Sequence, residues 1–310
     1  MKADASAIIL HQYDVSPFSE KVRVVLGMKK LAWFACDQPV IMPKPDLLAL
    51  TGAYRKIPVM QIGADIYCDT QIIIRELERR FPSPSILVGG DRGIGYGIGF
   101  WTDRPLFLAV VAALFGGDWQ ADEAFIKDRE QLMGRPFDIA GMREAAPHAA
   151  EQMRAQFGWV EEQLSDGRAF LMGAEPGLVD ADVYHNIAFL RWGGPGATRI
   201  IDAFPRLRAW EERVKAIGHG ERSEIGREEA IAVARAATSI AAPATDAGEP
   251  NGLKAGDRIM VMADDYGRDP VEGELVSSSA QHVAVRRTDP RAGEIVVHLP
   301  RAGFTIVRAR

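Results

Sequence analysis

The chain has 310 residues, which is long enough for about two or three domains with hydrophobic cores of their own. Its 37 Lys and Arg residues nearly balance 42 Asp and Glu residues, and the resulting net charge of −5 argues against a nucleic-acid-binding protein. The two cysteines, Cys36 and Cys68, lie far apart in no metal-like spacing, so we expect neither a disulfide framework nor a metal site.

The sequence shows no segment typical of secretion or of membrane insertion. Residues 1–6 lack the apolar core of a signal peptide and lead directly into an apolar strand. The longest strongly apolar run, 106–115, is too short to span a bilayer. The cysteine usage suits a reducing compartment. We therefore expect a soluble cytoplasmic protein that has no membrane partner.

An apolar strand followed by a capped helix opens the first predicted unit. Ile8 to Leu10 form a short apolar run, and Ser16 and Pro17 then supply the N-cap and the first residue of a helix predicted over 17–28. The free N–H groups of such a helix start attract anions, so a thiol placed beside the Ser16 hydroxyl would be shifted toward thiolate. Taken alone, the serine is read as a simple helix cap.

The same unit continues with alternating strands and helices, which predicts a small α/β layer domain. A cis bond before Pro58 would turn the N–H and C=O of Ile57 outward, where they can pair with an extended peptide. Asp69 and Thr70, at a helix start, can receive the ammonium and the carboxylate of a small ligand. Each pattern alone is more typical of an ordinary strand start or helix cap. We expect strands over 32–36, 59–62 and 65–67, helices over 46–50 and 70–80, and a hairpin turn at 63–64.

The pattern changes to helices alone over about 95–235, and then to short strands. An alanine- and proline-rich linker follows at 237–252. Five short strands in residues 253–310, separated by turns that contain Asp, Gly or Pro, predict a small closed barrel. The expected helices cover 100–115, 144–164, 180–192 and 207–217, and the third is apolar nearly all round, as is typical of the centre of a bundle.

Together, these patterns and their spacing resemble a known family. Residues 7–235 resemble a cytosolic glutathione S-transferase, which joins a thioredoxin-like domain to an all-helical domain. The segment Ser16-Pro17-Phe18, followed by Lys21-Val22-Arg23, is similar to the serine-type motif of the family in its tau/theta-like form. Lys56-Ile57-Pro58-Val59 is similar to the cis-proline segment, and Asp69-Thr70 stands where the family usually has Glu-Ser. The segment 176–180 resembles a helix-capping segment, with Gly177 in place of its usual Ser or Thr.

The resemblance implies a role for each of these residues. Ser16 would hydrogen-bond the sulfur of glutathione, the co-substrate, and would be the catalytic residue. Ile57 would pair with the cysteinyl backbone of glutathione, Asp69 and Thr70 with its γ-glutamyl end, and Lys56, together with Lys44, with its glycyl carboxylate. The implied glutathione-binding residues are Phe18, Lys44, Lys56, Ile57, Pro58, Asp69 and Thr70. The residues expected at the electrophile pocket are Tyr13, Phe100, Trp101 and Arg104.

The predicted fold class is an α/β thioredoxin-like domain, an all-α helical bundle and a small all-β barrel. The expected boundaries are residues 1–85 for the thioredoxin-like domain, 90–236 for the helical domain, 237–252 for the linker and 253–310 for the barrel. The barrel has no counterpart in the common family, which ends with the helices. Its nearly cancelling charges name no partner.

The function that the resemblance implies is a homodimeric, glutathione-dependent transferase of detoxification. Glutathione activated at Ser16 would attack a small hydrophobic electrophile, without a metal or a covalent enzyme intermediate. Serine in place of cysteine argues against thiol-transfer chemistry, because serine forms no mixed disulfide. Two alternatives stay open. One is a glutathione-dependent isomerase, and the other is a non-catalytic dimeric scaffold whose barrel recruits an unknown protein partner.

Overall fold

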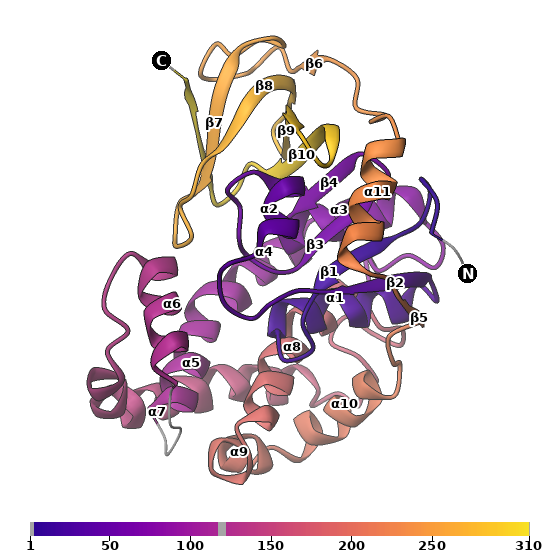
Figure 1. The fold of residues 1–310 in the computed structure, drawn as a ribbon. Helices are drawn as coiled ribbons and strands as arrows, with labels where there is room; N and C mark the ends of the chain where they lie inside the picture. Colours follow the sequence, from indigo (N-terminus) through magenta and orange to yellow (C-terminus); the bar gives the residue numbers. More distant parts are fainter. Residues whose placement is uncertain (1–2, 117–121, 310) are drawn as a thin grey trace.

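A mixed sheet with helices on both faces, and a helical region beside it, make up the structure (Figure 1). It is a computed structural model that describes residues 3–116 and 122–309. The helices predicted over 17–28 and 70–80 are confirmed at both ends. The first elements are β1 (Ile9–Gln12), α1 (Pro17–Met28), β2 (Ala32–Asp37), α2 (Pro45–Thr51), β3 (Val59–Ile62), β4 (Asp65–Cys68) and α3 (Thr70–Arg80).

The helical region follows α3. Its elements are α4 (Ile94–Trp101), a π-helical turn (Thr102–Leu106), α5 (Phe107–Phe115), α6 (Glu123–Met133), α7 (Ile139–Gln163), α8 (Leu178–Trp192), α9 (Pro195–Asp202) and α10 (Pro205–Lys215). The sequence patterns missed α6 and α9. The predicted helix over 100–115 is longer than expected, because it begins at Ile94, and it contains a π turn around Pro105. Such turns recur at functional sites.

The long helix from Ile94 to Phe115 corrects the expectation that was based on residues 106–115 alone. Its 22 residues make it long and apolar enough to cross a membrane, by length and composition only. Core helices of soluble proteins have the same length and composition. In this fold α4 packs against α8 and α5 packs against α7.

The five predicted C-terminal strands are present, but they do not form the expected closed barrel. The last elements are β5 (Glu221–Glu224), α11 (Arg227–Ala236), β6 (Ala244–Thr245), β7 (Arg258–Ala263), β8 (Val271–Ser278), β9 (His282–Asp289), β10 (Gly293–Pro300) and β11 (Phe304–Arg308). The strand order is β11-β7-β8-β9-β10-β4-β3-β1-β2-β5, with the short β6 on β8. Among the described residues, no pairing joins β11 back to β10, so the sheet stays open.

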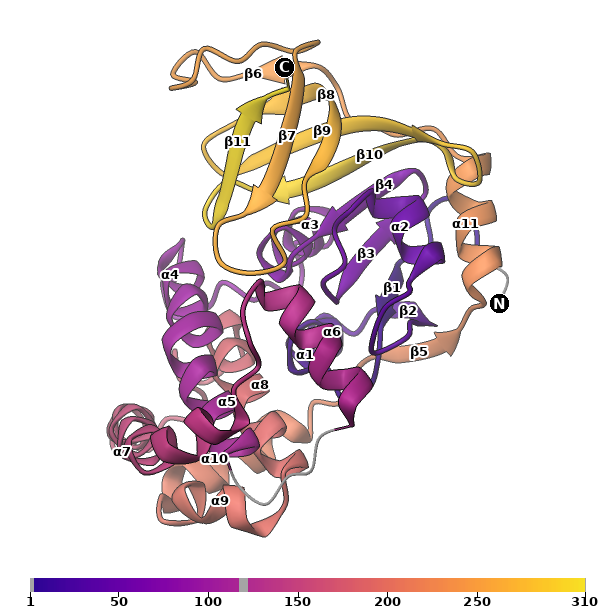
Figure 2. The same cartoon turned by 60° about the vertical axis from the view of Figure 1, so that its left-hand side comes forward.

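The reason for the difference is the pairing of β10 with β4. These strands run parallel, with Val297 opposite Ile66, so the C-terminal strands extend the thioredoxin-like sheet (Figure 2). Val297, Leu299 and Ile66 are fully buried in one hydrophobic cluster that also contains residues of α2 and α11. Removal of the C-terminal strands would therefore expose the core of the first unit to water.

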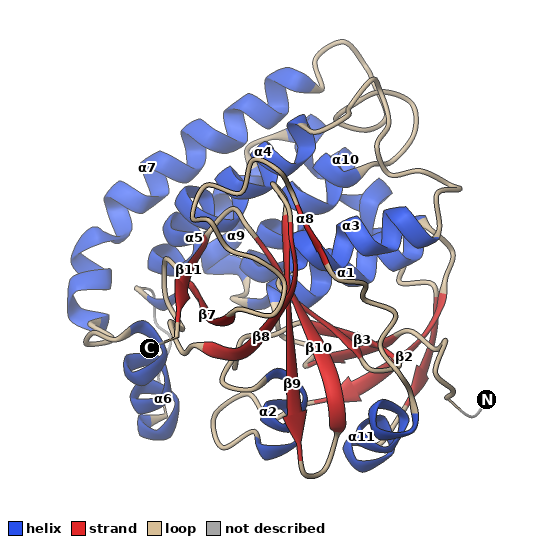
Figure 3. Ribbon diagram, turned by 90° about the horizontal axis from the view of Figure 1, so that it is seen from above, coloured by secondary structure: helices blue, strands red, loops and turns tan. Residues whose placement is uncertain are grey.

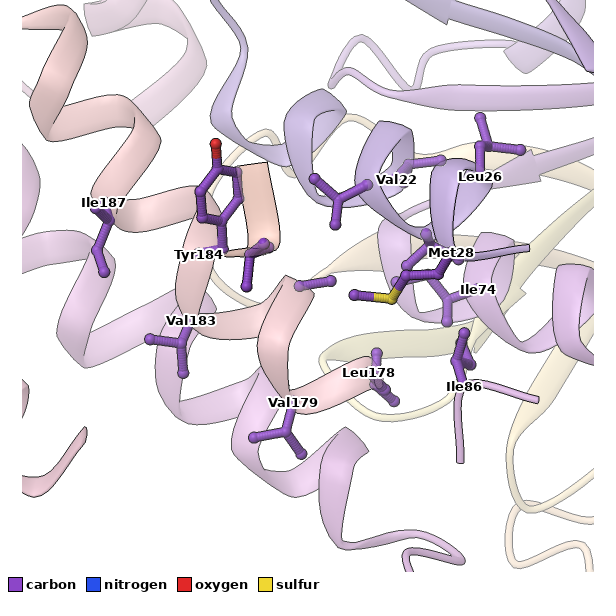
Figure 4. Packing of buried hydrophobic residues seen from close by; sticks show 14 of the residues in the cluster. Val22, Leu26, Met28, Ile74, Ile86, Leu178, Val179, Val183, Tyr184 and Ile187 are labelled. Atoms are coloured by element: carbon purple, nitrogen blue, oxygen red, sulfur yellow. The ribbon is translucent and has the colours of Figure 1, made fainter. Parts of the chain in front are cut away.

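The two faces of the sheet are covered differently. Helices α2 and α11 lie on one side, and α1, α3 and α8 lie on the other (Figure 3). Val22 and Leu26 of α1 and Ile74 of α3 pack with α8 residues such as Leu178 and Val183 (Figure 4). This contact fixes the start of α1 against the helical region.

Asp180 holds the start of the central helix α8. Its Oδ2 accepts a hydrogen bond from the N–H of Gly177 at 2.8 Å. Its Oδ1 accepts from the N–H of Leu171 at 2.8 Å and from Nε1 of Trp210 at 2.7 Å. The glycine that replaces the usual hydroxyl residue thus leaves the aspartate half of the cap in place.

Candidate active site

A cavity of about 230 Å³ opens where the sheet meets the helical region. Its walls come from the start of α1, the loop before β3, the start of α3, the helix from α4 to α5, α6 and two loops of the C-terminal strands. The predicted site residues that line it are Tyr13, Ser16, Phe18, Lys44, Lys56, Ile57, Pro58, Asp69, Thr70, Phe100 and Arg104. The fold therefore brings three separate sequence motifs to one place.

Ser16 stands at the N-terminus of α1 and lines the cavity, with only 2% of its surface exposed. Its Oγ accepts a hydrogen bond from the N–H of Ser19 at 3.1 Å, so it caps α1 as predicted. A serine hydroxyl also donates, and its proton remains available for a group in the cavity. Together with the dipole of α1, this donor stabilises a thiolate or another anion.

The loop before β3 offers free backbone groups. The Ile57–Pro58 peptide bond is cis, and both residues line the cavity. Among the described residues, no other backbone group pairs with the N–H or the C=O of Ile57. This edge can therefore receive the backbone of an extended peptide.

Lys44 lies near this edge and is only 4% exposed. Its Nζ lies 5.4 Å from the centre of the Tyr13 ring and 3.4 Å from the carbonyl oxygen of Arg55. Burial, followed by the nearby charge of Arg129, lowers the pKa of Lys44 to about 8. Its ammonium form is therefore less dominant at neutral pH than that of an ordinary lysine.

Asp69 caps α3 in a backbone conformation that is unusual for a side-chain-bearing residue. Its φ angle is 90°, and its Oδ1 accepts a hydrogen bond from the N–H of Gln71 at 2.9 Å. Burial raises the pKa of the Asp69 carboxyl, while Lys56 opposes the rise. Backbone strain of this kind is typical of binding sites, where it orients a side chain. Thr70, the first residue of α3, is buried beside it and also lines the cavity.

The opposite wall is aromatic. The Phe18 and Phe107 rings lie 4.7 Å apart, and Phe107 stacks at 6.0 Å on Phe189. All three rings line the cavity. Trp101, which was expected at the electrophile pocket, does not line this cavity, and its Nε1 donates to Oε1 of Gln156 on α7 at 2.8 Å.

A buried charge cluster, which the sequence patterns did not reveal, lies behind the cavity. Lys21 on α1 contacts Asp103 of the π turn and Asp182 of α8, each at 2.7 Å. Nε2 of His185 lies 3.1 Å from Oδ1 of Asp103. Asp103 lines the cavity. The Lys21 side chain does not line it and is only 2% exposed. Although burial opposes ionisation, Lys21 and His185 hold the pKa of Asp103 at about 2, so its carboxylate stays ionised and paired with Lys21 at the edge of the cavity.

The second carboxylate of this cluster makes the stability of the fold depend on pH. Burial raises the pKa of Asp182 from 3.8 to about 7, although Lys21 opposes the rise. Between these values the folded protein holds a proton that the unfolded chain has lost. This group therefore lowers the free energy of unfolding as pH rises, by up to about 1.4 kcal/mol per pH unit.

We expect Asp182→Asn to remove this contribution. Urea unfolding of both proteins at pH 5 and pH 8 measures it, because the variant should gain stability relative to wild type at the higher pH. Burial also lowers the pKa of His185, and this shift makes stability rise with pH, in the opposite sense to Asp182. Because both proteins contain His185, the difference between them reports on Asp182. If the free energy of unfolding of the variant differs from that of wild type by the same amount at both pH values, the raised pKa of Asp182 is contradicted.

Two loops of the C-terminal strands also reach the cavity. Asp265 and Tyr266, between β7 and β8, line it together with Gly303 and Phe304 at the start of β11. No local pattern in the sequence pointed to these residues. The C-terminal strands therefore contribute directly to the candidate site.

The remaining reactive groups lie elsewhere. Cys36 and Cys68 are free and buried, and burial raises the pKa of both thiols, so they remain protonated at neutral pH. Within the described part of the chain, no group of three or more His, Cys, Asp or Glu side chains is arranged to hold a metal ion.

Comparisons with known proteins agree with this architecture. Residues 10–85 match the family described as "Glutathione S-transferase, N-terminal domain", and residues 118–222 match one described as a domain of unknown function. The chain is 29% identical over 213 residues to "Probable glutathione S-transferase BZ2" of Zea mays, covering 66% of this chain and 84% of that protein. It is 22% identical over 213 residues to glutathione S-transferase U3 of Arabidopsis thaliana, covering 65% and 81%.

Solved structures extend the comparison to the C-terminal strands. A GST-like protein from Pseudomonas syringae is 37% identical, with a TM-score of 0.82, and the match covers 98% of this chain and 100% of that one. The tau class enzyme MiGSTU from mango shares the fold, with a TM-score of 0.53, 20% identity and coverage of 68% and 89%. The predicted thioredoxin-like and helical parts are thus confirmed.

Proposed function

The chain belongs to the glutathione S-transferase family, and we propose that it conjugates the thiolate of glutathione to a small hydrophobic electrophile at the cavity described above. One observation carries the proposal. Ser16, the free backbone of Ile57 and the Asp69 carboxylate, which come from three motifs, line one cavity whose other wall is aromatic. A tripeptide with a reactive sulfur fits the polar wall, and an apolar reactant fits the aromatic one.

Each polar group has a role in binding glutathione. Ile57 pairs with the cysteinyl backbone, and Asp69 and Thr70 take the γ-glutamyl ammonium and carboxylate at the start of α3. Lys56 takes the glycyl carboxylate, together with Lys44. Phe18 and Pro58 also line the cavity and contact the bound tripeptide. With its two ends bound in this way, we infer that glutathione presents its sulfur to Ser16.

The chemistry consists of thiolate stabilisation and positioning. The Ser16 hydroxyl donates to the sulfur and, with the dipole of α1, lowers the pKa of the bound thiol. A sulfur lone pair forms the new bond to the electrophilic carbon as the leaving group departs with its bonding electrons. No bond to the protein forms, which matches a serine rather than a cysteine at this position.

The wider features of the proposal follow the family. We infer a cytoplasmic, homodimeric enzyme whose electrophile pocket contains Tyr13, Phe100 and Arg104, with Phe107 and Phe189 as its apolar floor. The contribution of the C-terminal strands to the cavity favours a role in substrate binding over recruitment of a protein partner.

Calorimetric titration with glutathione, together with conjugation to a generic aryl halide, tests the proposal. We expect wild type to bind glutathione with a dissociation constant of about 1 μM to 1 mM. Asp69→Asn should weaken binding about tenfold, because the amide keeps the helix cap but offers no charge to the ammonium. The matched control is a glutathione analogue that lacks the γ-glutamyl amino group, which both proteins should bind equally. Wild type that neither binds glutathione nor conjugates it would refute the proposal.

A further inference from the structure

The loop between β7 and β8, residues 264–270, is bound to two elements of the helical region. Asp264 pairs with Arg104 of the π turn at 2.6 Å. The N–H of Gly267 donates to the carbonyl oxygen of Leu132 on α6 at 2.8 Å. The C-terminal strands therefore hold this loop against the helical region at the cavity.

The same loop engages Lys56. The ammonium of Lys56 lies 3.2 Å from Oδ1 of Asp265 and 3.1 Å from the carbonyl oxygen of Tyr266. It also lies 4.7 Å from the centre of the Tyr266 ring and 5.8 Å from that of Phe304. The Lys56 side chain is 13% exposed and that of Asp265 is 28% exposed, so the pair is only partly hydrated. All these partners come from the C-terminal strands and their loops.

A ligand carboxylate that approaches Lys56 competes with Asp265 for the same ammonium. The ion pair is already neutral, so it attracts the incoming anion less than a free lysine would, and the two carboxylates repel each other. Asp265 therefore weakens the binding of ligands that end in a free carboxylate, but not of ligands that end in a neutral group.

We propose that Asp265 is a specificity-determining residue of the glutathione site, which lowers the affinity of the cavity for the free glycyl carboxylate through its contact with Lys56. The inference rests on the proposed function, because it takes Lys56 as the group that binds this carboxylate. It assigns the C-terminal strands a task at the site, since they supply the competing anion.

Titration of the full chain with two ligands tests the inference. The ligands are glutathione and its C-terminal amide, which differ at the group that faces Lys56. Asp265→Asn should strengthen glutathione binding about threefold to fivefold, the size of a partly exposed ion pair, and should leave binding of the amide unchanged. The matched control is Asp269→Asn, an exposed residue of the same loop with the same change of charge, which should alter neither affinity.

The outcomes separate this inference from the proposed function. If Asp265→Asn weakens glutathione binding, Asp265 orients Lys56 for the ligand and the competition is refuted. If Asp265→Asn changes the affinities for both ligands equally, the contact with Lys56 does not discriminate between carboxylate and amide. The same conclusion follows if Asp269→Asn changes the two affinities as Asp265→Asn does. In each of these cases glutathione still binds, so the proposed function survives. Absence of binding of both ligands by all three proteins would overturn both proposals.

Discussion

Replacement of Ser16 by alanine should lower kcat/KM for glutathione conjugation about a hundredfold to a thousandfold, the usual cost of removing one donor to a reacting anion. The Ser16 hydroxyl lines the cavity at the start of α1, and only the side chain supplies this donor. Glutathione binding should change little, because Ile57, Asp69 and Lys56 remain. The pH dependence of the rate should move upward, toward the ordinary thiol pKa of about 8.5.

Two measurements separate this effect from a loss of structure. Alanine also removes the N-cap of α1, which costs about 1 kcal/mol of stability, so the free energy of unfolding is measured beside the rate. Ser19→Ala is the matched control, because the Ser19 hydroxyl is buried, has no hydrogen-bond partner among the described residues and does not line the cavity. A similar loss of rate in both variants, or an unchanged pH profile in Ser16→Ala, would rule out a role for Ser16 at the sulfur.

Local signals explain why the first unit could be predicted so closely. The start of α1 is set by Ser16 and Pro17, and α3 runs from the cap at Asp69 to the residue before Phe81 and Pro82. Such caps act within one turn of helix, so the sequence alone contains them. The positions of Ile57 and Asp69 at one cavity could be predicted only from the resemblance, because nothing local relates the two segments.

The errors have equally physical causes. Alternating apolar residues and turns predict strands, but they do not predict which strands pair with each other. The pairing of β10 with β4 joins segments that are far apart in the chain: His298 on β10 bonds to Asp65 on β4, 233 residues away. Trp101 follows Phe100 directly, and neighbouring residues on a helix point about 100° apart. Phe100 and Arg104, four positions apart, share the face that lines the cavity, and the Arg104 guanidinium lies 4.1 Å from the Phe100 ring centre.

The buried charge cluster shows most plainly what sequence patterns cannot reveal. Lys21 belongs to the segment that resembles the family motif, yet its partner Asp103 lies 82 residues away along the chain. A lysine on an amphipathic helix is ordinarily exposed. Here it is buried because carboxylates from the π turn and from α8 converge on its ammonium.

Replacement of Lys21 by methionine should therefore destabilise the fold by about 3–5 kcal/mol, as is typical when one partner of a buried ion pair is removed. Methionine fills similar space but leaves Asp103 and Asp182 buried without a counter-charge. Although burial lowers the pKa of Lys21, the two carboxylates hold it above its ordinary value, so the ammonium is charged in the native protein. Urea unfolding at pH 8, where the carboxylates ionise most fully, measures the loss.

A second variant distinguishes lost charge balance from lost packing. Adding Asp182→Asn to Lys21→Met removes one of the two uncompensated carboxylates, so the double variant should be more stable at pH 8 than Lys21→Met alone. The control is Lys215→Met, which makes the same substitution at an exposed position of α10. It should change the free energy of unfolding by less than about 0.5 kcal/mol. If the second substitution adds to the damage instead, the cost of Lys21→Met arises from packing, and the ion cluster does not hold α1 to the helical region.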